Sequence, residues 1–539
     1  MKSLLFLISF FSLCINALAK EPDFEIELQS GKQYLFSGQV SEASQAADRI
    51  LKLAESPDDK ALAYFFKSQV EFYKSNYTKA RELGEKSHAL IPADKEIGGF
   101  LDYIIKVAKN GERFEEVKTE HFIIRYSHSK DSILVSYAED VLERVYYEIG
   151  LDLESYPSEP VVVEIYPNLE SFTLASTLSE NDIKTTGVVG ICKFNRIMIL
   201  SPRLLPQGYT WLDTLAHEYT HYLIFLKSGN TVPVWLHEGI AKFEEKRWKE
   251  KKRNVINPFY ETLLAKALKA NNLVPIEKMH PSLGKLSSAY EAQLAFAQVG
   301  TIVDFLVKKW GNKSLVDLLN NIKEKNDYKV AIKEVTKKNF ADFYNTWIRD
   351  LRSRNLKERT PQVKVKELRF EEKRAGSKDQ SEDLVELDNA QAKNYTRLGD
   401  MLRTRGRLKA ATYEYEKALH FDPLSPIILN RLASTLSAYG EYDKAKERLT
   451  PLFELHPEYI ETYTNLGKIY LEKGNLNKAE EAYTQAISIN PFNPEIHIAL
   501  ISIYKKLGRT DLEEFEKKVL NVLLEDDVVT QPYENTNTK

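Results

Sequence analysis

The chain has 539 residues, of which 43% are hydrophobic and 28% are charged, and its 75 basic residues nearly balance its 78 acidic ones. At about 100–200 residues per domain, this length predicts about three domains or more. The composition is typical of a globular protein. The net charge of −3 gives no electrostatic basis for binding nucleic acid, so no nucleic-acid partner is predicted.

Residues 1–19 indicate a cleavable secretory signal. Lys2 supplies a positive start, the apolar run LLFLISFFSLCI follows, and Ala17 and Ala19 are the small residues that a signal peptidase reads. This run is shorter than the ~20 apolar residues of a membrane-spanning helix, and no other stretch approaches that length, so no transmembrane segment is predicted. We therefore expect export to the periplasm or secretion.

The two cysteines, Cys14 and Cys192, add little to this prediction. Because Cys14 lies inside the predicted signal, the mature chain keeps one thiol and cannot form an internal disulfide. Cys14 could instead anchor a bacterial lipoprotein, but Leu13 precedes it where a small residue is expected, which makes lipid anchoring the less favoured alternative. Cys192 is expected to be a packed thiol.

Residues 20–110 have the spacing of helical repeats. Ala80 and Pro92 follow Ser75 by 5 and 17 residues, which are the separations found in the C-terminal repeats described below. The segment SGQVSEASQAADRIL, at 37–51, is typical of the second helix of such a unit. The region therefore predicts about two degenerate repeats.

A different pattern follows these helices. The runs HFIIRYS (121–127) and PVVVEIYP (160–167) are rich in β-forming residues, and VVGICKFNRIMILSP (188–202) indicates two short strands around a turn. From Tyr209 onwards the pattern is helical. Strands followed by helices predict an α+β domain over 111–356.

The segment DTLAHEYTHYLIF, at 213–225, carries a candidate metal site. His217 and His221 are one turn apart on a largely apolar helix, so both imidazoles face the same way and can bind one Zn²⁺. Glu218 lies about 100° around the helix from His217, where it can reach a water molecule beside the metal without being a ligand. The alternative is a helix that happens to hold two histidines.

A second segment, VPVWLHEGIAKFEE at 232–245, supplies a third ligand. Its WLHEGIA sequence resembles the Trp-Leu-x-Glu-Gly-x-Ala signature of the gluzincins, the metallopeptidase clan of the thermolysin-like enzymes and the large zinc aminopeptidases. In that clan the glutamate before Gly-x-Ala binds the metal, which implies Glu238 here. Neighbouring His237 competes by residue type, but on a helix it points about 100° away from Glu238.

The resemblance covers roughly residues 120–350 and implies a zinc-dependent peptidase with a zincin-like fold. It implies that the metal activates a water molecule and polarises the scissile carbonyl, and that Glu218 accepts the proton of this water. A peptide or protein is the implied substrate. In this clan the substrate backbone pairs with an edge strand, for which GVVGICKFNRIMI (187–199) is the candidate, and its two glycines could allow another chain to approach closely. The alternative for this segment is an ordinary hairpin.

Several positions depart from the pattern of the clan. The acid that orients a histidine in thermolysin-like enzymes would fall at Lys242, and Glu245 could replace it, although its charged surroundings favour a solvated side chain. The oxyanion-stabilising tyrosine of the aminopeptidases would fall at Phe296. Tyr290 is the nearest substitute as a catalytic residue, with simple packing or solvent exposure as the alternative. The amine-binding Gly-x-Met-x-Asn motif is missing, which favours an endopeptidase or a narrow processing enzyme.

Residues 389–525 repeat with a period of 34 residues. Four residue types keep this interval: Gly406, Gly440, Gly474 and Gly508; Pro423, Pro457 and Pro491; Ala411, Ala445 and Ala479; and Leu398, Leu432, Leu466 and Leu500. With LGKIYLEKGNLNKAEEAYTQAISINP at 466–491, the pattern resembles the tetratricopeptide repeat. Three full repeats and a shorter fourth unit are expected. Such arrays form concave surfaces that hold peptides or partner proteins.

The charged segment 357–388 predicts a linker and the tail 526–539 predicts disorder. Because such a linker makes few contacts, the catalytic region is expected to fold without 389–539. The sequence as a whole predicts a multidomain protein, with an α+β zincin-like peptidase domain flanked by all-α repeat segments. The rival hypotheses are a repeat scaffold that binds zinc without cutting and an interaction protein without metal.

Overall fold

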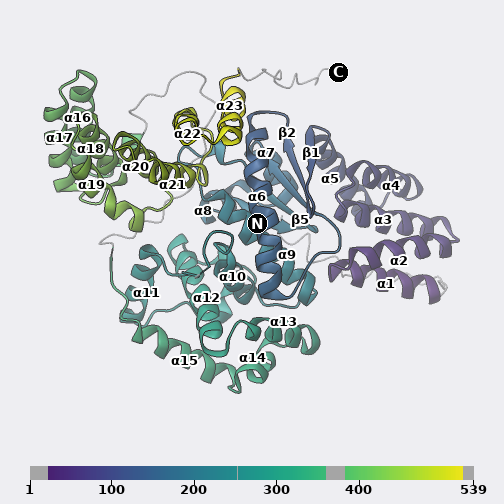
Figure 1. The fold of residues 1–539 in the computed structure, drawn as a ribbon. Helices are drawn as coiled ribbons and strands as arrows, with labels where there is room; N and C mark the ends of the chain where they lie inside the picture. The colour runs from purple at the N-terminus through teal and green to yellow at the C-terminus, as the bar shows by residue number, and fades with distance from the viewer. Residues whose placement is uncertain (1–21, 252, 360–382, 526–539) are drawn as a thin grey trace. The chain divides into compact units, whose positions relative to one another are not determined.

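A computed structural model describes residues 22–251, 253–359 and 383–525. The predicted signal and tail, with Cys14, and most of the predicted linker lie outside the described residues. The chain divides into two compact units, Met1–Lys109 and Asn110–Lys539, which Figure 1 shows in one colour ramp and which are described separately below.

The first unit consists of helices that pack in antiparallel pairs. They are α1 (Pro22–Phe36), α2 (Val40–Leu53), α3 (Pro57–Tyr73), α4 (Tyr77–Leu90) and α5 (Lys95–Gly111). The pair α3 and α4 is held by two hydroxyl groups, since Ser68 Oγ donates to the carbonyl of Ala80 at 2.6 Å and Ser87 Oγ donates to that of Ala61 at 2.7 Å. Gly31 lets α1 approach α3, because an added Cβ would lie 2.8 Å from the Phe66 ring.

The second unit begins with a mixed sheet in the order β1-β2-β3-β5-β4. Its strands are β1 (Phe114–Lys118), β2 (Phe122–Ser127), β3 (Val161–Tyr166), β4 (Gly190–Lys193) and β5 (Arg196–Leu200). The β2–β3 and β3–β5 pairs are parallel, whereas β1–β2 and β4–β5 are antiparallel. Strands β2 to β5 lie within the three predicted β-rich runs. In the described sheet, β4 is therefore an edge strand.

Helices cover both faces of this sheet (Figure 1). The long helices α6 (Ile133–Leu153) and α9 (Trp211–Ser228) pack on the face formed by alternate apolar residues such as Val163 and Ile197. The short helix α7 (Leu169–Ser176) lies on the other face, where the Phe172 ring contacts the Tyr166 ring at 5.9 Å between centroids. Three short elements connect these parts: η1 (Lys130–Ser132), α8 (Glu180–Thr186) and η2 (Pro202–Leu204).

A helical region follows α9, as the sequence predicted. It contains α10 (Val234–Glu244), α11 (Pro258–Ala270), η3 (Ile276–Met279), η4 (Leu283–Lys285), α12 (Ala289–Trp310), α13 (Lys313–Lys325), α14 (Tyr328–Thr336) and α15 (Phe340–Ser353). Helices α10 and α12 touch at Gly239, where an added Cβ would lie 2.8 Å from the carbonyl oxygen of Val299. The glycine of the WLHEGIA segment is therefore a packing position.

The C-terminal helices form the repeats. After η5 (Asp383–Glu386) come α16 (Ala390–Thr404), α17 (Leu408–Phe421), α18 (Pro426–Ala438), α19 (Tyr442–Leu455), α20 (Ile460–Glu472), α21 (Leu476–Ile487), α22 (Pro494–Leu507) and α23 (Thr510–Leu524). The four periodic glycines all have positive φ, between 67° and 88°, which ends the first helix of each unit. Leu384 and Leu387, within the predicted linker, are buried in the core of these repeats.

The last repeats pack against the region of residues 111–356 rather than standing apart from it. Trp211 Nε1 donates to the carbonyl of Ile487 at 3.1 Å, and Val519 and Leu523 of α23 are buried in the same core as α9. The expectation that residues 111–356 fold without 389–539 remains a prediction, and these contacts count against it. A predicted linker between two domains does not prevent their surfaces from burying apolar side chains together.

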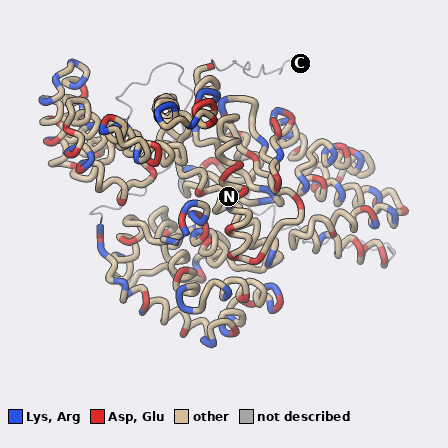
Figure 2. Tube along the Cα trace, in the orientation of Figure 1, with Lys and Arg blue, Asp and Glu red and all other residues tan. Residues whose placement is uncertain are grey.

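Among the described residues, no helix is long and apolar enough to span a bilayer. Figure 2 shows basic and acidic residues interspersed along the helices of both units rather than gathered on one element.

Candidate metal centre

Helix α9 carries both histidines of the HExxH segment. Trp211, Leu215 and Leu223 are fully buried along its length, and Gly229 ends it in a left-handed conformation with φ 64°. Because the apolar residues hold the helix against the sheet, the remaining side presents His217 and His221 towards α10.

Glu238 of α10 meets these two histidines. Its Oε2 lies 3.5 Å from Nε2 of His217 and 3.5 Å from Nε2 of His221. One ligand atom from each of the three residues lies within 4.8 Å of the other two. Two imidazole nitrogens and one carboxylate oxygen form a typical zinc donor set, and three protein ligands leave a position open for water or substrate. The residues present therefore fit the metal that the sequence motif implies.

The charges in this cluster stabilise one another. Burial alone would raise the pKa of Glu238, but His221 and His217 lower it well below its usual range. Burial alone would lower the pKa of His217, but Glu238 and Glu245 raise it to about 10. Glu238 is thus ionised at neutral pH, which a carboxylate must be in order to bind a cation.

His237, the competing ligand, lies on the other side of His221. The Nδ1 atoms of His221 and His237 are 2.5 Å apart, so His237 faces the ring nitrogen of His221 that points away from Glu238. Burial and the neighbouring His221 lower the pKa of His237 to about 3, which keeps its ring neutral. The structure therefore brings Glu238, and not His237, to the Nε2 atoms of both histidines.

Glu218 is buried between α9 and the edge strand, with 6% of its surface exposed. The backbone N–H of Cys192 donates to its carboxylate, although burial, the largest influence, raises its pKa. Gly190 permits this approach, because an added Cβ would lie 2.6 Å from Thr214 Cγ2 and 3.1 Å from Glu218 Oε1. The glycine thus admits α9, whereas the sequence suggested that it admits a substrate chain.

Glu245 is an outer partner of the cluster, and the expectation of a solvated side chain is wrong. Its Oε2 lies 3.7 Å from His217 Nδ1 and accepts a hydrogen bond from Lys242 Nζ at 2.8 Å. Burial would raise the pKa of Glu245, but Lys242 and His217 lower it to about 2. Lys242 is itself packed against Tyr260, with Nζ 5.3 Å from the ring centroid.

Tyr290, the predicted oxyanion donor, belongs to α12 and not to either of the two helices that carry the cluster. It lies in the first turn of α12 with 36% of its surface exposed. Nine residues separate it from Val299, where α12 meets α10, which corresponds to about 13 Å along a helix. Phe296 is half-buried and packs into the core. The structure brings the three ligands and Glu218 together and does not bring Tyr290 into contact with them.

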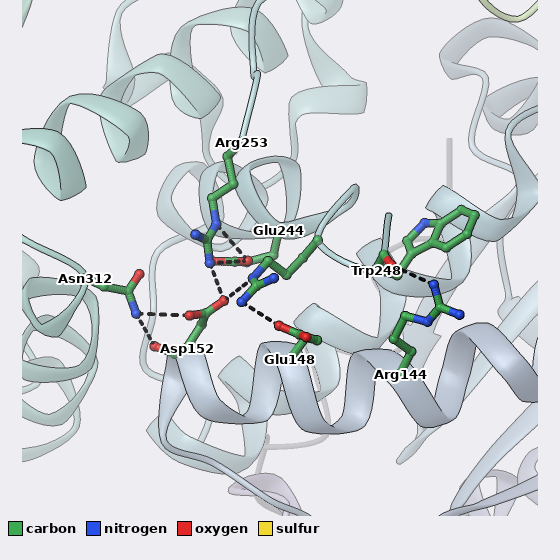
Figure 3. Close-up of polar contacts among 8 residues, drawn as sticks. Arg144, Glu148, Asp152, Glu244, Trp248, Arg253 and Asn312 are labelled. Atoms are coloured by element: carbon green, nitrogen blue, oxygen red, sulfur yellow. Dashed lines mark hydrogen bonds and ion pairs between the residues drawn. The ribbon is translucent and has the colours of Figure 1, made fainter. Parts of the chain in front are cut away.

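A buried polar cluster anchors the C-terminal end of α10 (Figure 3). Glu244 Oε2 accepts from the Arg253 guanidinium at 3.0 Å, and Arg253 also pairs with Asp152 of α6. Asp152 accepts from Arg247 Nε at 2.7 Å, and Asn312 Nδ2 donates to the Asp152 carbonyl at 2.9 Å. These contacts hold α10, and with it Glu238, in place relative to α6.

Sequence reasoning missed three contributors to the site. They are the Cys192 N–H, the missing Cβ of Gly190, and His237 on the side of His221 that faces away from Glu238. Each depends on which elements pack together, and spacing along the chain does not reveal it. The Lys242–Glu245 pair had a weak signal, because residues three apart face the same side of a helix.

Comparisons with known proteins match the two kinds of region. A family model described as the peptidase MA superfamily matches residues 138–352, which include the three candidate ligands and Glu218. A model of the tetratricopeptide repeat matches residues 460–493.

Individual relatives cover shorter stretches. BBSome complex member BBS4 of Bos taurus is 32% identical over 117 residues, which are 22% of this chain and 22% of that protein. Small glutamine-rich tetratricopeptide repeat-containing protein 2 of Mycosarcoma maydis is 25% identical over 121 residues, which are 22% of this chain and 34% of that protein.

Among solved structures, a thermophilic TPR protein of Thermus thermophilus is 29% identical, with a TM-score of 0.23 over 25% of this chain and 74% of that one. By the two family models, the chain combines a region that matches the peptidase MA superfamily with a region that matches the tetratricopeptide repeat, which is the combination that its two motifs predicted.

Proposed function

We propose that the protein is a zinc-dependent peptidase of the HExxH…E type, in which His217, His221 and Glu238 bind the metal and Glu218 is the general base. The observation that carries this proposal is the convergence of the three ligand atoms within 4.8 Å, next to a glutamate that is buried and oriented by a backbone N–H. A merely structural zinc site would not need that glutamate.

The chemistry divides between the metal and the chain. A zinc ion in this site would lower the pKa of a water molecule towards neutrality and polarise the scissile carbonyl. Glu218 would accept the proton of that water and deliver it to the leaving amine. Burial raises the pKa of Glu218, which makes the carboxylate a better proton acceptor than an exposed glutamate.

The edge strand β4 supports a binding mode for an extended peptide. The backbone N–H of Leu200 donates to the Val189 carbonyl at 2.8 Å, and the antiparallel register pairs Gly190 with Ile199. Hydrogen-bonded and non-hydrogen-bonded pairs alternate along such a ladder. The backbone groups of Gly190 and Cys192 therefore face the outer edge, as the Cys192 bond to Glu218 illustrates. A substrate strand could pair with the remaining groups.

The other parts of the proposal rest on the sequence. The signal at 1–19 supports export to the periplasm or secretion, with lipid anchoring through Cys14 as the less favoured alternative. The repeats support binding of a protein partner or of the substrate. A zincin-like fold is supported by the mixed sheet, by the edge strand beside α9 and by the position of Glu238 on the next helix.

The decisive experiment uses Glu218→Gln in the mature protein. The amide cannot accept a proton, while all three ligands remain, so we expect the zinc content to stay near one per chain and the cleavage of a denatured-protein panel to stop. Elemental analysis and product mass spectrometry measure the two outcomes. His221→Ala is the matched control and should lose the metal, because two protein ligands hold Zn²⁺ poorly.

The rival is a zinc-binding repeat scaffold that does not cut. The phenylalanine at 296, where the aminopeptidases carry the oxyanion-stabilising tyrosine, and the exposed position of Tyr290 favour it. A wild type that holds zinc but cleaves no member of the panel would establish the scaffold. Cleavage at the same rate by Glu218→Gln would remove Glu218 from the mechanism.

A further inference from the structure

Both metal-binding histidines have a second partner, and both partners belong to α10 or its end. The Nε2 atoms of His217 and His221 face Glu238, each at 3.5 Å. Their Nδ1 atoms face away from it, towards Glu245 at 3.7 Å and towards His237 at 2.5 Å respectively. A ligating histidine usually donates its free N–H to a carboxylate, a carbonyl or a water. His221 instead faces a second imidazole.

The proton positions follow from this geometry. A metal needs the lone pair of His221 Nε2, so the proton of the neutral ring must be on Nδ1. The atom 2.5 Å from it, Nδ1 of His237, must then offer a lone pair. The proton of His237 is consequently on its Nε2. In a neutral imidazole, Nδ1 can be either the donor or the acceptor. For His237, the Nδ1–H of His221 requires that Nδ1 be the acceptor.

We infer that His237 is a positioning residue, whose Nδ1 accepts a hydrogen bond from Nδ1–H of His221 and so holds the Nε2 lone pair of His221 towards the metal. This inference rests on the proposed zinc site. By residue type, His237 competes with Glu238 for the metal. In this inference it instead orients His221 for metal binding. One helix then supplies both, since His237 and Glu238 are neighbours in α10.

The test compares two polar substitutions. Asparagine carries its amide oxygen at the same number of bonds from Cβ as the histidine Nδ1, whereas glutamine carries it one bond farther out. In the full-length protein, we expect His237→Gln and His237→Leu to weaken zinc binding about 10–100-fold and His237→Asn to restore most of the affinity. Chelator competition measures the dissociation constants, and circular dichroism confirms that each variant is folded.

A spectroscopic signature separates positioning from packing. In ¹⁵N spectra of histidine-labelled, zinc-loaded wild type, the His221 signal should show the Nδ1–H tautomer with its proton in a hydrogen bond. His237→Asn should keep that signature and His237→Leu should lose the hydrogen bond. His128→Leu is the control, because the side chain of His128 is 85% exposed and lies outside the cluster.

Three results would overturn the inference. Unchanged zinc affinity in both His237→Leu and His237→Gln would show that His221 needs no such partner. Failure of His237→Asn to rescue would show that the acceptor atom is irrelevant. Complete zinc loss in every His237 variant, equal to that of His221→Ala, would make His237 a ligand. A wild type that binds no zinc would instead overturn the proposed function, which the stoichiometry of the wild type reveals before any variant is compared.

Discussion

At the scale of single residues, the site depends on an atom that is absent from the side chain of Gly190. An added methyl group would lie 2.6 Å from Thr214 and about 3 Å from the Glu218 side chain. Real Cβ contacts are not that short, so the Thr214 and Glu218 side chains, or the elements that carry them, would have to shift. Glycine is favoured here because these side chains of α9 lie directly against the strand, and not because of its conformational freedom.

We therefore predict that Gly190→Ala lowers kcat by at least about 10-fold while zinc is retained, because a displacement of about 1 Å in a catalytic group can cost 10²-fold. Steady-state kinetics and elemental analysis on one preparation measure this. Gly99→Ala is the control, since a methyl group there meets nothing within 4 Å. Wild-type kcat in Gly190→Ala would show that the strand relaxes without moving Glu218.

The second prediction at this scale concerns the effect of Tyr290→Phe on kcat. An oxyanion role predicts that Tyr290→Phe lowers kcat about 10²–10³-fold, because a donor to the oxyanion is lost. KM and zinc content should change little, since the bond strengthens mainly in the transition state. A nearly unchanged kcat would show that Tyr290 only packs or faces solvent, which is the result that its exposed position favours.

At the scale of secondary-structure elements, α10 organises the site. It carries Glu238 and places His237 beside His221, and Glu245, which directly follows its last residue, lies beside His217. Its packing against α12 at Gly239 and the polar cluster at Glu244 fix its position. A shift of this helix would therefore disturb the contacts of Glu238, His237 and Glu245 in the candidate metal site at the same time.

The pair of Lys242 and Glu245 gives the third prediction. Glu245→Gln should weaken zinc binding about 10–100-fold, because His217 loses the charged acceptor that orients its ring. Lys242→Met should have a smaller effect of the same sign, since Glu245 remains but is held less firmly. Chelator competition measures both dissociation constants.

The double variant Lys242→Asp/Glu245→Gln is the control for this pair. It puts an acid at the position where thermolysin-like enzymes carry one, and it should recover zinc affinity relative to Glu245→Gln. Equal zinc affinity in wild type and Glu245→Gln would show that the 3.7 Å approach to His217 has no influence on the metal.

At the scale of the whole molecule, the repeats of the second unit pack against residues 111–356. Val519 and Leu523 are buried in the core that also holds α9, and burying such a side chain contributes about 1.5–3 kcal/mol. The indole N–H of Trp211 would lose its partner without Ile487, which costs about 1–3 kcal/mol for a buried donor.

We therefore predict that deletion of 389–539 lowers the thermal midpoint of the catalytic region or makes it insoluble. Differential scanning calorimetry of the full-length and shortened chains measures the change. Deletion of 526–539 alone, which removes none of these contacts, is the control. A soluble shortened protein with an unchanged midpoint and full zinc content would restore the picture of independent domains.

The sequence by itself determined the elements that depend on local spacing. The 34-residue period, the β-rich runs and the four-residue step from His217 to His221 are local patterns, and helix and strand geometry converts each into a definite face. The resemblance of WLHEGIA to a known signature added Glu238 as the expected third ligand. These features are short-range, so one chain segment is enough to show them.

Only the tertiary structure decided the contacts between segments far apart in the chain. It placed the Cys192 N–H against Glu218, His237 against His221, Glu245 against His217 and α23 against the core that holds α9. Each depends on how helices and strands pack, and packing is set by shape and apolar burial over the whole unit. The charge run around Glu245 therefore indicated solvent, whereas packing buried the carboxylate beside a lysine and a histidine.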